Sequence, residues 1–144
     1  MRKILFRGKC ICDDKQNGYK KGDWIYGSLF IQSTTDEVFI FDRVTDDKVS
    51  VNPETVGQCT GIKDYSDKYK AYEGDIVQDL DDGTLGIVYW DEEEAGFMIE
   101  IENCAVPAQD ISYYQVIGNK WDNPELFKDY LESHDIKRCW RNYK

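Results

Sequence analysis

The hydrophobic positions in the first third of the chain follow the two-residue period of β-strands. Four stretches read as strands: the alternating residues 2–12, the segment 23–31 rich in aromatic and β-branched residues, the short apolar run 38–41, and 49–51. Polar turns separate these stretches, and Asn17-Gly18 is a strong short-range hairpin signal. Val49 and Val51 share one face of the last stretch, while Ser50 points away. The pattern predicts a meander of antiparallel strands in the N-terminal half.

A short interruption follows this meander. Asn52 can supply a cap oxygen and Pro53 suits a first helical position, so one capped helical turn is expected there. Gly57 and Gly61 then prevent a longer helix, and residues 64–68 form a polar loop or hairpin.

A second β region begins near residue 72. Gly-Asp-Ile-Val at 74–77 and Gly-Ile-Val-Tyr-Trp at 86–90 are separated by an acidic loop. A further strand at 97–101 places Phe97, Ile99 and Ile101 on one face. Strands joined by such loops resemble the hairpins of small SH3-like barrels, so residues 72–118 are expected to adopt this kind of fold.

The end of the chain carries the clearest helical signal. Asp122 or Asn123 can cap a helix, Pro124 suits its first turn, and an apolar face follows at helical spacing. This predicts a helix over about 124–133, followed by a basic and aromatic C-terminal tail at 132–144. The expected fold class is therefore mainly β, a β-rich α+β protein.

The composition agrees with one folded domain. The chain has 144 residues, of which 41% are hydrophobic and 14% aromatic, too many for a disordered acidic chain. Its net charge of −10 excludes a broadly basic nucleic-acid binder, so no direct nucleic-acid partner is expected. Residues 1–62 carry nine basic and nine acidic groups, whereas residues 63–118 carry three and fourteen. The excess of negative charge therefore lies in the second β region.

Two acidic loops account for much of that excess. Their carboxylates come from Asp79, Asp81 and Asp82 in one loop, and from Asp91, Glu92, Glu93 and Glu94 in the other. The loops lie at opposite ends of one strand, about 20 Å apart, so they do not form one divalent site. They form solvated turns that prevent edge aggregation, an acidic surface for a basic protein partner, or a weak Mg²⁺ or Ca²⁺ site.

No set of residues with catalytic spacing is present. The five cysteines have irregular spacing without C-x-x-C, and they are expected to be reduced. His134 is the single histidine, and no nucleophile can be assigned to it. Trp24, Tyr26, Trp90 and Phe97 are expected to lie in the core. We therefore assign no catalytic, cofactor-binding or metal-binding residue.

No targeting segment is expected at the N-terminus. Arg7 and Lys9 interrupt the apolar residues that follow Met1 before the apolar core of a signal peptide can form. No stretch of 18 or more apolar residues occurs. The expectation is a soluble cytoplasmic protein without a membrane partner.

Several segments together resemble one protein family, the YopX proteins of bacteriophages and prophages. The resemblance covers about residues 1–131 and rests on segments in a fixed order: Met1–Gly8, Gly22–Leu29, Val51–Gly61, Tyr72–Val77, and Val116–Asn119 through Asn123–Leu126. The sequence departs from the family pattern in the loop at 64–68 and at Ala71, and residues 132–144 extend beyond it.

This resemblance implies a phage or prophage accessory protein in a bacterial cytoplasm, with a tendency to self-associate. It implies one domain over 1–131, with possible lobes at 1–62 and 63–131, and it supplies no activity or functional residues. The favoured hypothesis is a non-enzymatic, homo-oligomeric module that binds a host or phage protein. Two alternatives stay open: an acidic DNA mimic directed at a DNA-binding protein, and a metal-dependent hydrolase.

Overall fold

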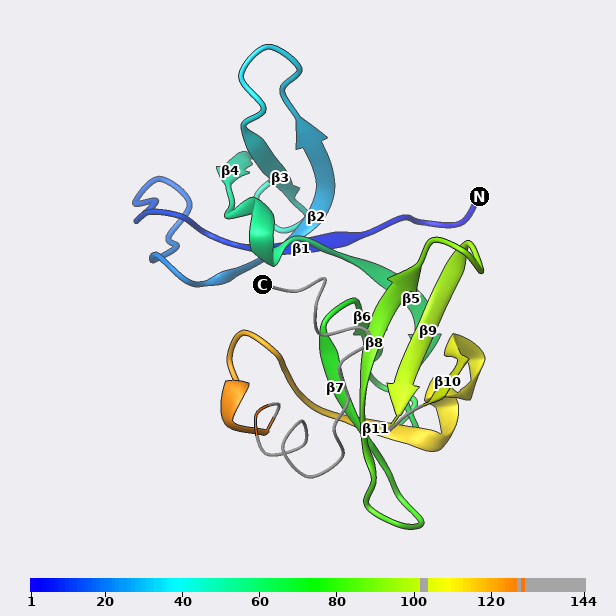
Figure 1. Ribbon diagram of the computed structural model, residues 1–144. Coiled ribbons are helices and arrows are strands. Elements are labelled where there is room, and N and C mark those ends of the chain that lie inside the picture. Colours follow the sequence, from blue (N-terminus) through cyan, green and yellow to red (C-terminus); the bar gives the residue numbers. More distant parts are fainter. Residues whose placement is uncertain (102–103, 127, 129–144) are drawn as a thin grey trace. The chain divides into compact units, whose positions relative to one another are not determined.

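The computed structural model describes residues 1–101, 104–126 and 128 (Figure 1). Its strands form two antiparallel sheets, with the orders β4-β3-β2-β1-β5-β6 and β10-β9-β8-β7-β11, which confirms the mainly β fold class. The chain divides into two compact units, Met1–Cys59 (unit 1) and Thr60–Lys144 (unit 2), which we describe separately. In the described part of the chain, no helix combines the length and apolar character that crossing a membrane requires.

Unit 1 is a meander in which each strand pairs with the next, as predicted. Its strands are β1 (Phe6–Lys9), β2 (Trp24–Ile31), β3 (Val38–Asp42) and β4 (Lys48–Ser50). The loop between β2 and β3 extends beyond the rest of the sheet (Figure 1). The first residues of β5 (Gly57–Lys63) pair with β1, so Arg7 lies opposite Gly57.

One face of this meander forms the core of unit 1. Cys10, Ile25, Ile40, Val49 and Val51 are its buried residues. Burial of both valines, with Ser50 only partly buried, confirms the predicted alternation in the last strand. Fully burying an aliphatic side chain contributes about 1.5–3 kcal/mol, so this face is the main source of stability in the unit.

The capped turn predicted at Asn52 is present as the 3-10 helix η1 (Pro53–Thr55). The side-chain oxygen of Asn52 accepts a hydrogen bond from the Glu54 N–H at 3.0 Å. The Thr55 hydroxyl accepts from the Lys9 N–H at 2.8 Å and donates to the Asn52 carbonyl at 2.7 Å. These bonds fix the turn against the end of β1.

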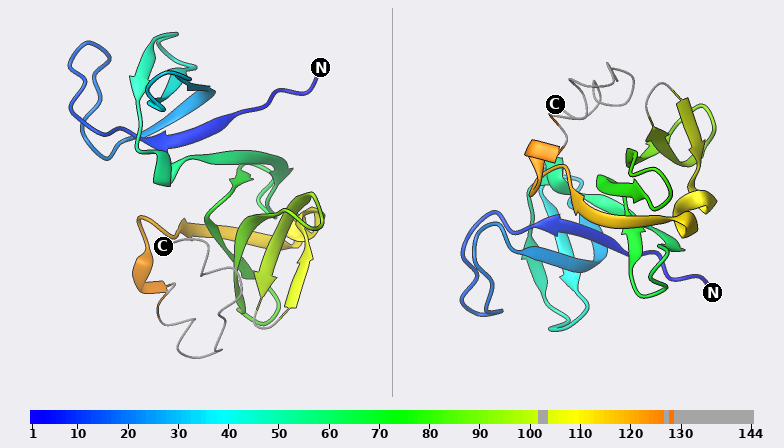
Figure 2. Two further views of the ribbon diagram at one scale, coloured as in Figure 1. Left: turned by 45° about the horizontal axis from the view of Figure 1, so that its top comes forward. Right: turned by 90° about the horizontal axis from the view of Figure 1, so that it is seen from below.

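Unit 2 contains the second sheet. Its elements are β6 (Lys70–Tyr72), β7 (Asp75–Asp79), β8 (Leu85–Asp91), β9 (Gly96–Ile101), β10 (Cys104–Pro107), the 3-10 helix η2 (Ala108–Tyr113) and β11 (Tyr114–Asn119). β7 to β10 pair in sequence, and β11 then returns to pair with β7 (Figure 2). The hairpins expected in this region are therefore present, with η2 leading from β10 into β11, which lies beside β7.

The core of unit 2 draws on β6, strands of the second sheet and η2. Ala71, Val77, Val88, Ile99 and Ile111 are all fully buried. Gly74, at the turn into β7, has a φ of +86° and lies directly under the ring of Trp121. A side chain there would both strain the backbone and collide with the indole.

The predicted C-terminal helix begins where the sequence places it. Residues 124–126 and 128 are helical, and the Leu126 N–H donates to the Asn123 carbonyl at 3.2 Å. The rest of that helix, the tail at 132–144 and His134 lie outside the described residues.

Candidate functional site

The first acidic loop joins β7 to β8, and its carboxylates hold the turn. Asp79 accepts a hydrogen bond from the Asp81 N–H at 2.8 Å, and Asp82 accepts from the Thr84 N–H at 2.8 Å. The Thr84 N–H lowers the pKa of the Asp82 carboxyl. The side chain of Asp81 is exposed beyond these bonds, and so is that of its neighbour Leu80.

The second acidic loop joins β8 to β9, and Asp91 organises it. One oxygen of Asp91 accepts from the N–H groups of Glu93 and Glu94 at 2.9 and 3.1 Å. Its other oxygen accepts from the Tyr89 hydroxyl at 3.2 Å. Because Asp91 fixes the backbone, Glu92, Glu93 and Glu94 remain exposed at the surface. Of the four carboxylates predicted for this loop, those of Glu92, Glu93 and Glu94 are therefore exposed to solvent, and that of Asp91 is used within the turn.

The two loops lie at opposite ends of the seven-residue strand β8, as predicted. They therefore do not combine into one site. Over the described ranges 1–101, 104–126 and 128, no three His, Cys, Asp or Glu side chains gather as a metal site would require.

A second surface, which the sequence analysis did not identify, lies on the face of the unit 1 meander opposite its core. Residues directly opposite each other in antiparallel strands point to the same side. The register therefore places one set of side chains together: Arg7, Lys9, Trp24, Tyr26, Ser28, Phe30, Phe39, Phe41, Lys48 and Ser50. We call this set the aromatic–cationic face. Half of its positions are aromatic, three are cationic and none carries a carboxylate.

Cations lie over most of the rings of this face. Arg7 lies 4.6 Å and Lys9 5.3 Å from the centroid of Trp24. Lys48 lies 4.4 Å from the centroid of Phe39, and Arg43, at the border of the face, lies 5.3 Å from that of Tyr26. Arg7 is only 1% exposed, so its contact with Trp24 is buried, whereas the side chains of Arg43 and Lys48 are exposed. At exposed sites such contacts contribute about 0.5–1 kcal/mol each. They hold positive charge on the sheet of a protein whose net charge is −10.

The outer end of the face is accessible. Phe30 and Phe41 are each 43% exposed, and their rings meet edge to face with centroids 6.1 Å apart. Phe39 is buried beneath Phe30 and Lys48. The exposed part is thus an apolar centre with a cationic border, the arrangement found in protein interfaces.

The prediction that four aromatic residues lie in the core is only partly right. Phe97 packs against the unit 2 core. Trp24 and Tyr26 are half-buried on the aromatic–cationic face. Trp90 is 44% exposed, so its assignment to the core is wrong: it pairs with Phe97 edge to face at the end of β8. A strand end beside a turn leaves one side of a large ring without neighbours.

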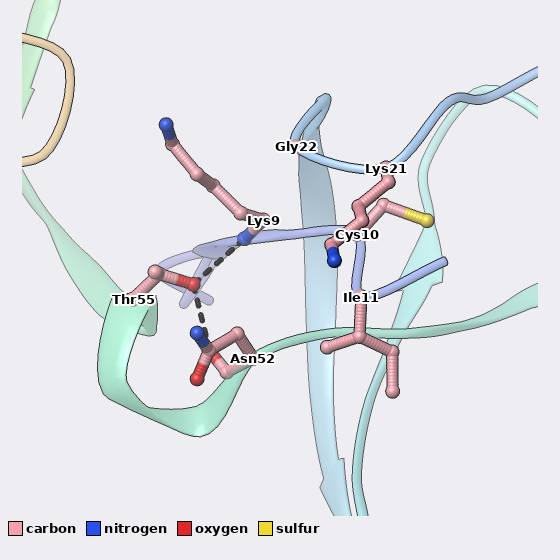
Figure 3. A pocket seen from close by; sticks show the side chains of 7 residues that line it. All are labelled: Lys9, Cys10, Ile11, Lys21, Gly22, Asn52 and Thr55. Atoms are coloured by element: carbon pink, nitrogen blue, oxygen red, sulfur yellow. Dashed lines mark hydrogen bonds between the residues drawn. The ribbon is translucent and has the colours of Figure 1, made fainter. Parts of the chain in front are cut away.

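A hollow of about 370 Å³ lies at the end of β1 in unit 1. Its lining residues are Lys9, Cys10, Ile11, Lys21, Gly22, Asn52 and Thr55 (Figure 3). Three segments that are distant in the sequence meet here: the end of β1, the turn before β2 and the η1 turn. The Cys10 thiol donates to the Cys12 carbonyl at 2.8 Å, and burial raises its pKa, so the thiol stays neutral.

These features define a class: a small, mainly β protein that displays acidic turns on one unit and an aromatic–cationic sheet face on the other. The chain belongs to the YopX family, since the family model described as YopX protein matches residues 10–128. That match includes the hollow apart from Lys9, the aromatic–cationic face from Trp24 onward and both acidic loops. A search of curated proteins gives no match to the chain.

Proposed function

We propose that this YopX protein is a non-enzymatic, self-associating interaction module, encoded by a phage or prophage and active in the cytoplasm of the bacterial host. The observation that supports this proposal is the accessible end of the aromatic–cationic face. Exposed apolar patches with a polar border are typical of protein–protein interaction sites. Phe30 and Phe41 form such a patch on a regular sheet, with Arg43 and Lys48 at its border.

The partner with the best fit is the acidic loop of a second copy. Each acidic loop pairs exposed carboxylates with one exposed apolar side chain, Leu80 in the first loop and Trp90 in the second. An apolar anchor beside carboxylates complements an apolar patch bordered by cations. Contact between two different surfaces of identical chains is heterologous, so it produces rings or filaments rather than an isologous dimer.

Paired charge reversals test this contact. Arg43→Glu with Lys48→Glu reverses the border of the face, and Glu92→Lys with Glu93→Lys reverses the second acidic loop. All four side chains are exposed and lie outside the cores, so both variants should fold. Light scattering at about 50 mM salt should show a mass above 16.8 kDa for the natural chain and a monomer for each variant. A mixture of the two variants should assemble again.

A second pair of variants tests the apolar centre. Phe30→Thr with Phe41→Thr should abolish assembly, because it removes the exposed rings while keeping β propensity. Val44→Thr is the matched control, since Val44 is 80% exposed but lies in the β3–β4 turn. A natural chain that remains monomeric at about 100 μM, or assembly that survives the Phe substitutions, would contradict the proposal.

The displayed loop also supports a second candidate, a DNA mimic. Asp91 holds Glu92, Glu93 and Glu94 outward, in a segment that carries fourteen acidic and three basic groups over 63–118. Such a loop can occupy the basic surface of a DNA-binding protein. In that case Glu92→Gln, Glu93→Gln and Glu94→Gln together abolish binding to that protein, while Phe30→Thr with Phe41→Thr has no effect on it.

A further inference from the structure

The hollow at the end of β1 has the features of a small-ligand site. Its volume of about 370 Å³ lies within the range of roughly 300–1,000 Å³ that is usual for such sites. Its lining includes two lysines, one amide, one hydroxyl and one thiol, and no carboxylate. In Figure 3, Lys21 extends from its turn toward Cys10 and Ile11, while Asn52 and Thr55 come from the η1 turn.

Hydrogen bonding within the protein already occupies most polar groups of this lining. The N–H groups of Cys10, Ile11 and Gly22 donate to the carbonyls of Asp23, Ser50 and Cys10. The Thr55 hydroxyl both accepts and donates, as described above. The lining is therefore a fixed framework, and its binding capacity rests on the remaining side-chain groups.

Two of these remaining groups are donors. In the described part of the chain, the Lys21 ammonium makes no ion pair or hydrogen bond, and its backbone N–H alone is bound, to Asp13. The Asn52 side-chain oxygen accepts from Glu54, which orients the amide, and its NH₂ group makes no bond there. A ligand that binds both donors must offer hydrogen-bond acceptors. Because the Lys21 ammonium is positively charged, an anionic acceptor is favoured.

We propose that this hollow binds a small organic anion, whose carboxylate or phosphate accepts hydrogen bonds from Lys21 and Asn52 and whose apolar body packs on Ile11. The size of the hollow exceeds what a bare inorganic ion needs, and Ile11, 48% exposed, supplies apolar surface at its rim. The framework exists without a ligand, so binding requires little ordering of the protein.

The two proposed donors are separate from the self-association surface, because neither Lys21 nor Asn52 belongs to the aromatic–cationic face. Lys9 lines the hollow and belongs to that face, but its ammonium lies over the Trp24 ring, and neither set of variants changes it. Light scattering on each variant will show whether assembly is unchanged, so the two proposals can fail separately.

The test uses three probes that share one ring: phenyl phosphate, benzoate and benzyl alcohol. Amide chemical shifts of Ile11, Gly22 and Thr55 report binding in the full chain. We expect saturable shifts with phenyl phosphate or benzoate, and whichever binds more tightly identifies the anion. Equal binding of neutral benzyl alcohol, or no saturable shift with either anion up to about 10 mM, would overturn the proposal.

Two substitutions assign the donors. Lys21→Met removes the charge and keeps the aliphatic chain, so affinity should fall about tenfold. Asn52→Asp keeps a cap oxygen for Glu54 but replaces the NH₂ donor with a repelling carboxylate, and a similar loss is expected. Lys20→Met is the matched control: Lys20 is exposed, adjacent and outside the lining. If Lys21→Met binds as well as Lys20→Met, Lys21 is not the anion ligand.

Discussion

Unit 1 and unit 2 are both built on antiparallel sheets, but they place their charge in opposite ways. Unit 1 is neutral overall, and its cations lie over aromatic rings in the middle of a sheet face. Unit 2 carries the negative excess, and its displayed carboxylates lie in turns beyond the strand ends. Long cationic side chains can extend along a pleated surface and pack on rings, whereas short carboxylates cap the N–H groups of tight turns. The net charge of a segment therefore does not reveal which surface it presents.

In contrast, the two units use buried carboxylates in the same way. In unit 1, Asp42 is 2% exposed and accepts hydrogen bonds from the Tyr19 hydroxyl, the Val44 N–H and the Thr45 hydroxyl. In unit 2, Asp64 is 5% exposed and accepts from Ser66 and from the Val116 N–H, which belongs to β11. Both carboxylates join segments that are distant in sequence, since a buried charge must be hydrogen-bonded.

The largest stability effect is expected in unit 2, at Gly74. Gly74→Ala combines a φ of +86° with a collision against Trp121, so we expect a loss of about 3 kcal/mol in the free energy of unfolding. Gly83→Ala is the matched control, because its φ of +78° is similar but its nearest neighbour is 3.8 Å away. That variant should lose about 1 kcal/mol. Equal losses in urea unfolding would show that the Trp121 contact contributes nothing.

The next effect is expected in unit 1, at the Tyr19–Asp42 pair. Tyr19→Phe removes a 2.5 Å hydrogen bond to a buried carboxylate and should cost about 2 kcal/mol. Hydrogen exchange should show the loss of protection in unit 1. Tyr113→Phe, at a side chain 71% exposed, should change stability by less than about 0.5 kcal/mol.

The same pair predicts how stability depends on pH. The hydrogen bond to Asp42 raises the pKa of Tyr19 from 10.0 to about 12. The unfolded chain therefore loses this proton first, so the contribution is complete below pH 10 and disappears as the pH rises toward about 12. Burial alone would raise the pKa of Asp42, but hydrogen bonds from Tyr19, Val44 and Thr45 outweigh it and lower that pKa below 3.8. Its contribution is therefore present above pH 3.8 and falls in more acidic solution.

Unfolding curves measured between pH 9 and 12 test the Tyr19 contribution. The Tyr19→Phe variant should show a flatter decline than the natural chain. A parallel decline in both proteins would mean that another group causes the alkaline loss.

The smallest effect on stability is expected in the second acidic loop, where Asp91 holds the turn and the neighbouring glutamates are exposed. Asp91→Ala should cost about 1 kcal/mol, because the N–H groups of Glu93 and Glu94 lose their acceptor. Asp91→Asn keeps an acceptor and should cost less. Glu93→Gln should stay within about 0.5 kcal/mol, since its side chain is exposed. Thermal unfolding of the three variants gives the ranking, and a large loss for Glu93→Gln would contradict this division of roles.

Strands with strong local signals could be predicted from the sequence, and those that depend on distant partners could not. β2, β3, β8 and β9 are rich in aromatic and β-branched residues, and their bounds in the structure lie within one or two residues of those predicted. β1 is shorter than the apolar stretch over 2–12, because pairing with β2 covers only Phe6–Lys9. β5, β6, β10 and β11 were not predicted. β10 is only four residues long, and β11 exists as a strand through its pairing with β7.

One of the two candidate surfaces could likewise be found from the sequence, and the other could not. The acidic loops could be found from the sequence, because turn carboxylates are local features. The aromatic–cationic face could not, since its members come from four strands and only the register places Lys9 beside Trp24 and Lys48 beside Phe41. Aromatic residues at alternate positions of β2, from Trp24 to Phe30, were the available signal, but a buried face gives the same pattern.

The sequence by itself determined the β-rich fold class, the location of the negative charge, the capped turn at Asn52 and the family resemblance, because each depends on neighbouring residues. Only the tertiary structure decided that Trp90 is exposed, that Asp91 shapes its loop while Glu93 is displayed, and that Lys21 and Asn52 border one hollow. Those outcomes depend on which strands pair and in what register. Long-range pairing is set by the burial of whole faces, which no single stretch of the chain specifies.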